Sequence, residues 1–267
     1  MTPWHSAEST SIEWDGYAES WIDESPQRLW RLHSDALNAR LLSRWLPRER
    51  VGLIVKTDLF DEAVTGGLYS QLMEKADCVA AIDVSTRVVN AAHERHSGML
   101  AIAADVRDIP LEDECADVVV SFSTLDHFDE FDDIPTAMRE VFRILRPGGT
   151  LILTMDNPSN PVLAVRNSLP FVLTHRAGLV PYPVGRTHDA RTMTRLTEEA
   201  GFDIIERTSI MHAPRLLAIQ CLRLADADAR KSQHRIARVL MAFERLERLP
   251  SRFFTGHFIA IRAAKAG

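Results

Sequence analysis

The sequence has few cysteines, no long apolar run and no excess of positive charge. Its three cysteines, Cys78, Cys115 and Cys221, are too widely spaced for a disulfide framework or a metal site, so we expect buried thiols in a reducing compartment. No segment approaches the roughly 18 apolar residues of a membrane span, and residues 1–27 lack the apolar core of a signal peptide. The formal net charge of −6 argues against a polyanionic partner. These absences predict a cytoplasmic protein with a small-molecule substrate, without nucleic acid, membrane or metal.

Glycine is missing from the segment that follows the first predicted strand. The apolar residues at 51–55 predict a buried strand, and residues 56–62 continue as Lys-Thr-Asp-Leu-Phe-Asp-Glu. Glycine allows positive φ and close approach of a backbone to a ligand, which phenylalanine and glutamate do not readily allow. The next glycines, Gly66 and Gly67, come at least four residues later. A ligand loop at this position therefore needs another geometry.

The pattern of apolar residues alternates between strand and helix spacing. The first predicted helix, Gln27–Leu46, is amphipathic and is ended by Pro47. Strands are predicted at 51–55, 78–82, 100–104, 117–122, 150–155, 202–210 and 253–262, and helices near 68–75, 85–92, 132–145 and 190–200. This order is typical of α/β proteins with a Rossmann-like, doubly wound parallel sheet.

Two segments interrupt that pattern. Residues 157–188 carry several prolines around an apolar middle and are predicted to form a lid over a substrate. Residues 222–249 are predicted to form an inserted helix whose apolar stripe packs on the core or on a second copy in a homodimer. We therefore expect a helical lead-in over residues 1–50 and one domain over residues 51–267.

Acidic residues close the second and third predicted strands. Asp83 is placed to accept hydrogen bonds from ribose hydroxyls, as dinucleotide-binding sheets require of an acid at this position. Asp105, followed by Val106, can receive the exocyclic amine of an adenine. The alternative is that both are ordinary carboxylates near helix N-termini, where negative charge is favoured. Their occurrence on consecutive strands favours a nucleotide site.

Several segments together resemble one enzyme family. They are Asp83-Val84-Ser85, the stretch Ala104 to Leu111, the stretch Asp117 to Phe128, which ends Leu-Asp-His-Phe, and Glu140 to Gly149, which ends Arg-Pro-Gly-Gly. Their order and spacing resemble the class I S-adenosylmethionine-dependent methyltransferases, with closest similarity to the small-molecule, ubiquinone- and menaquinone-type branch. The resemblance covers residues 79–155 and, less closely, 185–202. It implies a seven-stranded sheet with a reversed last strand, S-adenosylmethionine as cofactor, and methyl transfer to a small organic acceptor at oxygen or nitrogen.

The resemblance also implies which residues form the site. Cofactor contacts are expected from the residues aligned with the family's strand ends and with an aromatic position ahead of its first helix: Tyr17, Lys56, Thr57, Asp58, Asp83, Val84, Asp105, Val106 and Ser123. Catalytic contacts are expected from His127, which matches a family histidine after the fourth strand, and from Asp126 before it.

The first loop departs from the family. Its relatives end the first strand with an acid and continue into a glycine turn, whereas here Lys56 stands at the acid position and Asp58, Phe60 and Glu62 stand at glycine positions. Three accounts remain open. Asp58 or Asp61 holds the cofactor's ammonium while Lys56 holds its carboxylate; the loop accepts a related adenosyl or nucleotide ligand; or the domain has lost this cofactor and serves as a binding or scaffold module. The structural alternative is that this segment is a solvated helix N-terminus with Asp61 and Glu62 in its first turn, where negative charge is favoured.

Overall fold

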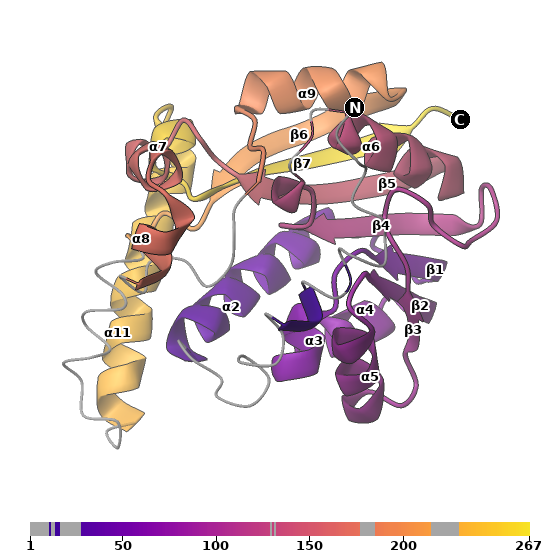
Figure 1. Ribbon diagram of the computed structural model, residues 1–267, viewed down its shortest axis with the longest axis horizontal. Helices are drawn as coiled ribbons and strands as arrows, with labels where there is room; N and C mark the ends of the chain where they lie inside the picture. Colours follow the sequence, from indigo (N-terminus) through magenta and orange to yellow (C-terminus); the bar gives the residue numbers. More distant parts are fainter. Residues whose placement is uncertain are drawn as a thin grey trace.

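The computed structural model describes residue 11 and residues 14–16, 28–128, 130, 132–176, 185–214 and 230–267. They contain a seven-stranded sheet in the order β3-β2-β1-β4-β5-β7-β6 (Figure 1). The strands are β1 (Val51–Lys56), β2 (Ala76–Asp83), β3 (Leu100–Ala103), β4 (Ala116–Phe122), β5 (Leu145–Asp156), β6 (Phe202–Ile210) and β7 (Phe258–Lys265).

The sheet is mixed in the way the family resemblance implies. Strands β1 to β5 run parallel, while β7 pairs antiparallel with both β5 and β6. The predicted fold class and the reversed last strand are confirmed. The predicted start of that strand at Phe253 is wrong, because Arg252–Thr255 forms the short helix α12 and β7 begins at Phe258.

Helices cover both faces of the sheet (Figure 1). The longer helices are α2 (Arg28–Trp45), α5 (Thr86–Arg95), α6 (Asp133–Ile144), α7 (Pro161–Ser168), α9 (Ala190–Glu199) and α11 (Arg230–Phe243). The shorter ones are α3 (Phe60–Val64), α4 (Tyr69–Met73), α8 (Phe171–Arg176) and the 3-10 turns η1 (Leu125–His127) and η2 (Glu244–Arg248). No helix among the described residues is long and apolar enough to cross a membrane.

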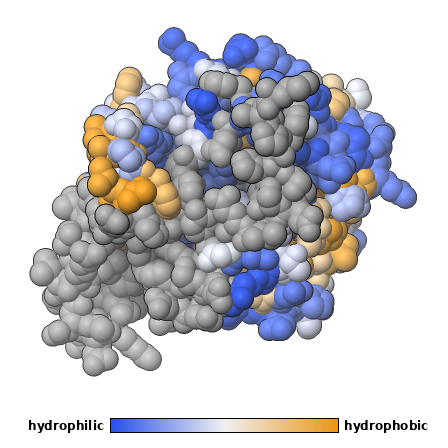
Figure 2. All heavy atoms as spheres, in the orientation of Figure 1, coloured by the Kyte–Doolittle hydropathy of each residue, from blue (hydrophilic) through white to orange (hydrophobic). Residues whose placement is uncertain are grey.

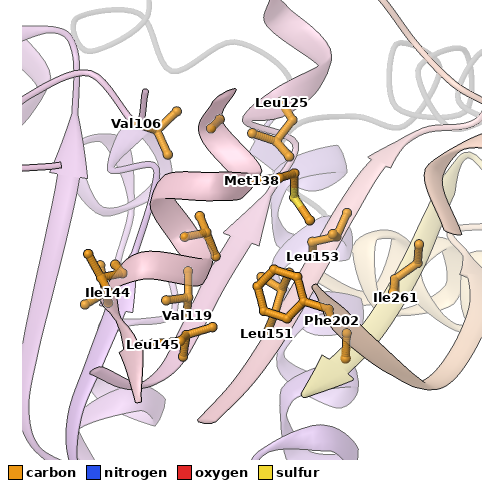
Figure 3. Packing of buried hydrophobic residues seen from close by; sticks show 14 of the residues in the cluster. Val106, Val119, Leu125, Met138, Ile144, Leu145, Leu151, Leu153, Phe202 and Ile261 are labelled. Carbon is orange, nitrogen blue, oxygen red and sulfur yellow. The ribbon is translucent and has the colours of Figure 1, made fainter. Parts of the chain in front are cut away.

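Alternate residues of each strand pack into different layers. On β4, Val119 joins a cluster with α6 and α9, whereas Val118 and Val120 join a cluster with α2 and α4. Burial on both faces explains why β4 reads as a continuous apolar run. Figure 3 shows the first layer, in which Met138 of α6 lies above Leu151 and Leu153 of β5.

Local signals in the sequence set several boundaries. Ser85 caps α5 by accepting a hydrogen bond from Val88 N at 3.2 Å, as predicted. Gly201 follows α9 with φ of 101°, a conformation that glycine adopts without strain. Residues 146–149 do not separate α6 from a strand but lie inside β5, where the register with β4 shifts at a bulge.

The two predicted insertions are partly described. Residues 222–229 lie outside the described residues, and α11 packs through Leu240 onto Leu37 of α2, while Val239 of the predicted apolar stripe is 59% exposed. The expectation of buried thiols is wrong for Cys78, which is exposed near the beginning of β2, and Cys115 is half-buried; Cys221 lies outside the described residues.

Candidate functional site

A cavity of about 240 Å³ lies at the carboxyl edge of the parallel strands. It is lined by residues at or just after the ends of β1 to β4, namely Thr57, Asp58, Asp83, Val84, Asp105, Val106, Ser123 and Thr124, and by residues of α2, β5 and the start of β7. Ligands of doubly wound sheets bind at this edge. The structure thus brings together at one cavity eight residues from four different loops.

Asp83 closes β2 and faces this cavity. Its Oδ2 accepts a hydrogen bond from Leu59 N at 3.0 Å, and its Oδ1 accepts one from Ser85 N at 2.9 Å. Burial and the nearby Asp58 carboxylate raise the pKa of Asp83 to about 7. Asp83 therefore joins the β1 loop to the β2 loop and retains lone pairs for a ligand.

Asp105 follows β3 and is held in place by Arg107. Arg107 Nε lies 3.0 and 3.1 Å from the two Asp105 oxygens, and Nη2 lies 2.6 Å from Oδ2. The same guanidinium donates to Asp133 Oδ1 of α6 at 2.8 Å, and its hydrogen bond to Asp105 raises the pKa of Arg107 above its usual range. This bidentate contact fixes the orientation of the Asp105 carboxylate at the cavity wall.

Lys56 ends β1, but the structure does not place it among the residues that line the cavity. Its Nζ lies 2.8 Å from Glu62 Oε2 and 3.1 Å from Asp58 Oδ2, and it also contacts the Asp58 carbonyl. Burial lowers the pKa of Lys56, but the Asp58 and Glu62 carboxylates outweigh this effect and raise it above the usual range. The ammonium is therefore engaged inside the loop, whereas the family resemblance implies a cofactor contact.

The loop after β1 closes around Glu62 rather than around a glycine turn. Besides its pair with Lys56, Glu62 accepts a hydrogen bond from Leu68 N at 2.9 Å and is fully buried. The residue with positive φ here is Gly67, at 50°, and a Cβ on it would lie 2.5 Å from the Glu62 side chain. A glycine is therefore required after α3, because the chain there has a positive φ and passes close to the Glu62 carboxylate.

Hydroxyl groups connect the ends of β1 and β4. Thr57 Oγ1 lies 2.9 Å from Ser121 Oγ and 3.0 Å from Thr124 Oγ1. Ser123 has φ of 51°, an uncommon value for a residue other than glycine, and its amide donates to Thr154 O at 3.0 Å. Uncommon backbone conformations of this kind occur preferentially at functional sites.

The two predicted catalytic residues differ in position. His127 lines the cavity, and its ring packs edge-on against Trp14 with centroids 4.9 Å apart. Asp126 is 1% exposed and does not line the cavity; its Oδ2 accepts from Ser123 Oγ at 2.9 Å and from Asp156 N at 3.0 Å. Burial raises the pKa of Asp126. Asp126 therefore supports the end of β5, and its Oδ1 lies 3.8 Å from His127 Nε2.

Several cavity residues were not predicted from the sequence. Helix α2 contributes Arg31, Ser34 and Asn38, and Arg31 Nη1 lies 3.1 Å from Asp61 Oδ1. Burial, Asp35 and Asp58 together raise the pKa of Asp61 to about 7. The spacing of the α2 residues, three and then four positions apart, places them on one face of the helix, and that spacing is the signal that could have identified this group.

The residues that line the cavity beyond β4 were also not predicted from the sequence. They include Thr154 near the end of β5, and His257 and Phe258 at the start of β7. Thr154 precedes the other two residues by more than 100 positions in the sequence. No local pattern could have joined them.

Other predicted parts of the site are not brought to the cavity. Tyr17 lies outside the described residues. The described part of 157–188 contributes no lining residue. Apolar side chains of α7, of α8 and of the residue between them are exposed instead: Val162, Val165, Leu169, Val172 and Leu173. Figure 2 shows an apolar patch at the left of the molecule. Within the described ranges, no group of three or more metal-binding side chains occurs.

Comparisons with known proteins agree with this architecture. Residues 61–153 match the family model described as a methyltransferase domain. The chain is 33% identical over 73 residues to a malonyl-[acyl-carrier protein] O-methyltransferase of Pectobacterium atrosepticum, covering 27% of this chain and 28% of that protein. It is 29% identical over 164 residues to a probable S-adenosylmethionine-dependent methyltransferase of Mycolicibacterium smegmatis, covering 58% and 54%. The matches thus span between about a quarter and about half of these relatives.

A solved structure shares the fold over nearly the whole chain. The N-methyltransferase NodS of Bradyrhizobium japonicum, in complex with S-adenosyl-L-homocysteine, superposes with a TM-score of 0.56 at 14% identity, covering 94% of this chain and 97% of that one. The fold is therefore that of the class I Rossmann-like methyltransferases.

Proposed function

We propose that this protein binds S-adenosylmethionine at the carboxyl edge of its sheet and transfers the methyl group to a small organic acceptor at oxygen or nitrogen. The observation that carries the proposal is the pair Asp83 and Asp105. Asp83 ends β2, Asp105 follows the neighbouring strand β3, and both line one cavity. The methyltransferase-domain match over residues 61–153 includes both positions.

In this proposal, Asp83 accepts hydrogen bonds from the ribose hydroxyls and Asp105 receives the adenine amine, with Val84 and Val106 beside them. Ribose recognition by an acid at the end of the second strand is the established logic of such sheets. The Arg107 contact supports this role, because it holds the Asp105 carboxylate in one orientation. Tyr17 remains a predicted aromatic contact to the cofactor.

The methionine end of the cofactor is assigned to the loop after β1 and to α2. Asp58 and Asp61 line the cavity and suit the ammonium, while Thr57 and Ser123 supply hydroxyl groups. For the carboxylate we assign Arg31 in place of Lys56, because Arg31 lines the cavity and Lys56 pairs with Glu62. Lys56 is then a positioning residue that holds Asp58.

Methyl transfer from a sulfonium is a displacement that depends mainly on positioning, and a base is needed only when the acceptor carries a proton. His127 lines the cavity and is a candidate for that base, with Asp126 behind it. The homodimer, the cytoplasmic location, the ubiquinone- and menaquinone-type branch, and the domain limits remain predictions.

Calorimetry tests this function directly. Wild-type protein titrated with S-adenosylmethionine and with S-adenosylhomocysteine is expected to bind both in the micromolar range. The absence of any heat change at high micromolar concentrations of both ligands would reject the function and favour a related nucleotide ligand or a scaffold role.

A further inference from the structure

A second histidine, besides His127, lines the cavity. His257 directly precedes β7 and lines the cavity together with Phe258 and Thr154. Because β7 runs antiparallel to β5, its first residues lie at the carboxyl edge of the parallel strands. His257 Nε2 lies 3.4 Å from Asp156 Oδ1, and the two side chains are only 10% and 5% exposed.

Three strands hold this histidine in place. The His257 amide donates to the carbonyls of Ile210, which ends β6, and of Met211, both at 3.0 Å, and its carbonyl accepts from Asn157 N at 2.9 Å. The ring packs edge-on against Phe258 at 4.7 Å. An imidazole fixed in this way loses little further freedom when it contacts a ligand.

Asp156 is itself held by its neighbours. Arg166 of α7 contacts Asp156 Oδ2, and the Asp156 amide donates to Asp126 Oδ2 at 3.0 Å. A carboxylate beside one ring nitrogen orients an imidazole and stabilises its protonated form. Among the described residues, Asp156 is thus the carboxylate beside His257, and Arg166 and Asp126 in turn contact Asp156.

The surroundings indicate the chemistry of the acceptor. Phe122, Phe128 and Phe258 give this cavity apolar walls. The Asp156 carboxylate beside His257 disfavours an anionic group on the acceptor at that position. A neutral, apolar molecule with a hydroxyl fits both features. Among hydroxyls, a phenol has a pKa of about 10, which is much closer to the pKa of an imidazole than that of an alcohol, so imidazole is the better base for a phenol.

We propose that His257, oriented by Asp156, is the base that accepts the proton of a phenolic acceptor; this inference rests on the proposed function. As the new O–CH3 bond forms, the C–S bond of the sulfonium breaks and its electron pair stays on sulfur. The phenolic proton passes to the ring nitrogen of His257 that faces the acceptor. The products are a methyl ether, S-adenosylhomocysteine and an imidazolium stabilised by Asp156.

Ligand-observed NMR on the protein saturated with S-adenosylhomocysteine tests the acceptor site. The probes are phenol, its methyl ether anisole, which has the same ring but no acidic proton, and the anion benzoate. In wild type, phenol is expected to bind about tenfold more tightly than anisole, and benzoate more weakly than either. His257→Gln should reduce the affinity for phenol to that for anisole and leave the anisole affinity unchanged. The control is His93→Gln, at an exposed position on α5, which should change neither affinity.

Transfer of a labelled methyl group to phenol provides the second measurement. His257→Gln should lower the rate at least about 100-fold, as expected for loss of a general base, and Asp156→Asn should lower it less. The variants should keep the wild-type affinity for S-adenosylhomocysteine and the wild-type circular dichroism spectrum. If His257→Gln does not fold, His257→Asn is used in its place.

The outcomes separate this inference from the proposed function. If wild type fails to bind S-adenosylhomocysteine, the proposed function fails and the inference fails with it. If that ligand binds but phenol is not preferred over anisole, if benzoate binds best, or if His127→Gln alone removes the phenol preference, then His257 is not the base.

Discussion

Lys56 Nζ and Glu62 Oε2 lie 2.8 Å apart, and their side chains are only 3% and 0% exposed. Glu62 also accepts the amide of Leu68, so this single ion pair links the end of β1 to α3 and to the approach to α4. The segment that lacks glycines is therefore closed by a buried ion pair, and the Lys56 ammonium also contacts Asp58, which lines the cavity.

Breaking this pair is expected to destabilise the fold. Lys56→Met leaves the Glu62 carboxylate buried without its partner, which should lower the free energy of unfolding by about 3–5 kcal/mol. Urea denaturation followed by circular dichroism measures the change. The double variant Lys56→Met/Glu62→Leu should regain most of the loss, because no uncompensated charge remains. A loss below about 1 kcal/mol for Lys56→Met alone would contradict a structural role of this kind.

The two adjacent glycines after α3 should respond differently to alanine. Gly67→Ala introduces a Cβ 2.5 Å from the Glu62 side chain at a φ of 50°, whereas a Cβ at Gly66 meets nothing within 4 Å. We expect Gly67→Ala to cost roughly 1–3 kcal/mol of unfolding free energy, and Gly66→Ala to cost less than about 0.5 kcal/mol. Thermal or urea unfolding compares them, and equal effects would argue against the placement of Glu62 beneath Gly67.

Asp83 should dominate recognition of the adenosine part of the ligand. Asp83→Ala removes a charged acceptor and is expected to weaken S-adenosylhomocysteine binding by about 1–3 kcal/mol, measured by calorimetry. Asp77→Ala is the matched control, since Asp77 lies on the same strand with its side chain 74% exposed. Unchanged affinity in Asp83→Ala would remove the ribose assignment while leaving the fold intact.

Two ligands, one with and one without the amino-acid tail, can show whether Arg31 contacts that tail. Arg31→Gln should weaken S-adenosylhomocysteine binding about tenfold, the loss of a charge-assisted contact, and leave methylthioadenosine, which lacks the amino-acid tail, unaffected. Arg40→Gln, an exposed position on α2, serves as the control. Equal losses for both ligands would place the effect of Arg31 on the loop rather than on the carboxylate.

The raised pKa of Asp83 has a defined effect on stability. Burial and Asp58 raise this pKa from 3.8 to about 7, so the folded state binds more protons than the unfolded state between these pH values. The contribution of Asp83 to stability is thus largest below pH 3.8 and declines as pH rises to about 7. Asp83→Asn cannot ionise, and its stability relative to wild type should therefore increase from pH 5 to pH 8.

Urea unfolding of both proteins at several pH values measures that difference. Because His33, buried with its pKa lowered to about 4, and Glu244, raised to about 7, contribute equally to both proteins, their effects cancel. Asp77→Asn should give a difference that does not change with pH. A flat difference for Asp83→Asn would show that Asp83 is ionised at a lower pH than its burial implies.

Much of the site could be predicted because it follows strand ends. Asp83 and Asp105 come directly after apolar runs, and parallel strands necessarily bring their carboxyl ends to one edge. Lys56 could not be placed in this way, because the sequence shows its charge but not the partners that it contacts. Glu62 lies six residues away in the first turn of α3, as the alternative of a helix N-terminus predicts, but it is buried and not solvated.

The sequence by itself determined the alternation of strands and helices, the burial of the central strands and the acids that end β2 and β3, since these depend on local spacing and on hydrophobic burial. Only the tertiary structure decided that Lys56 turns into the loop, that Asp126 lies behind His127, and that His257, beside the start of β7, contacts Asp156 at the end of β5. Each of these depends on contacts between segments distant in the chain or on a change of direction that no periodicity encodes.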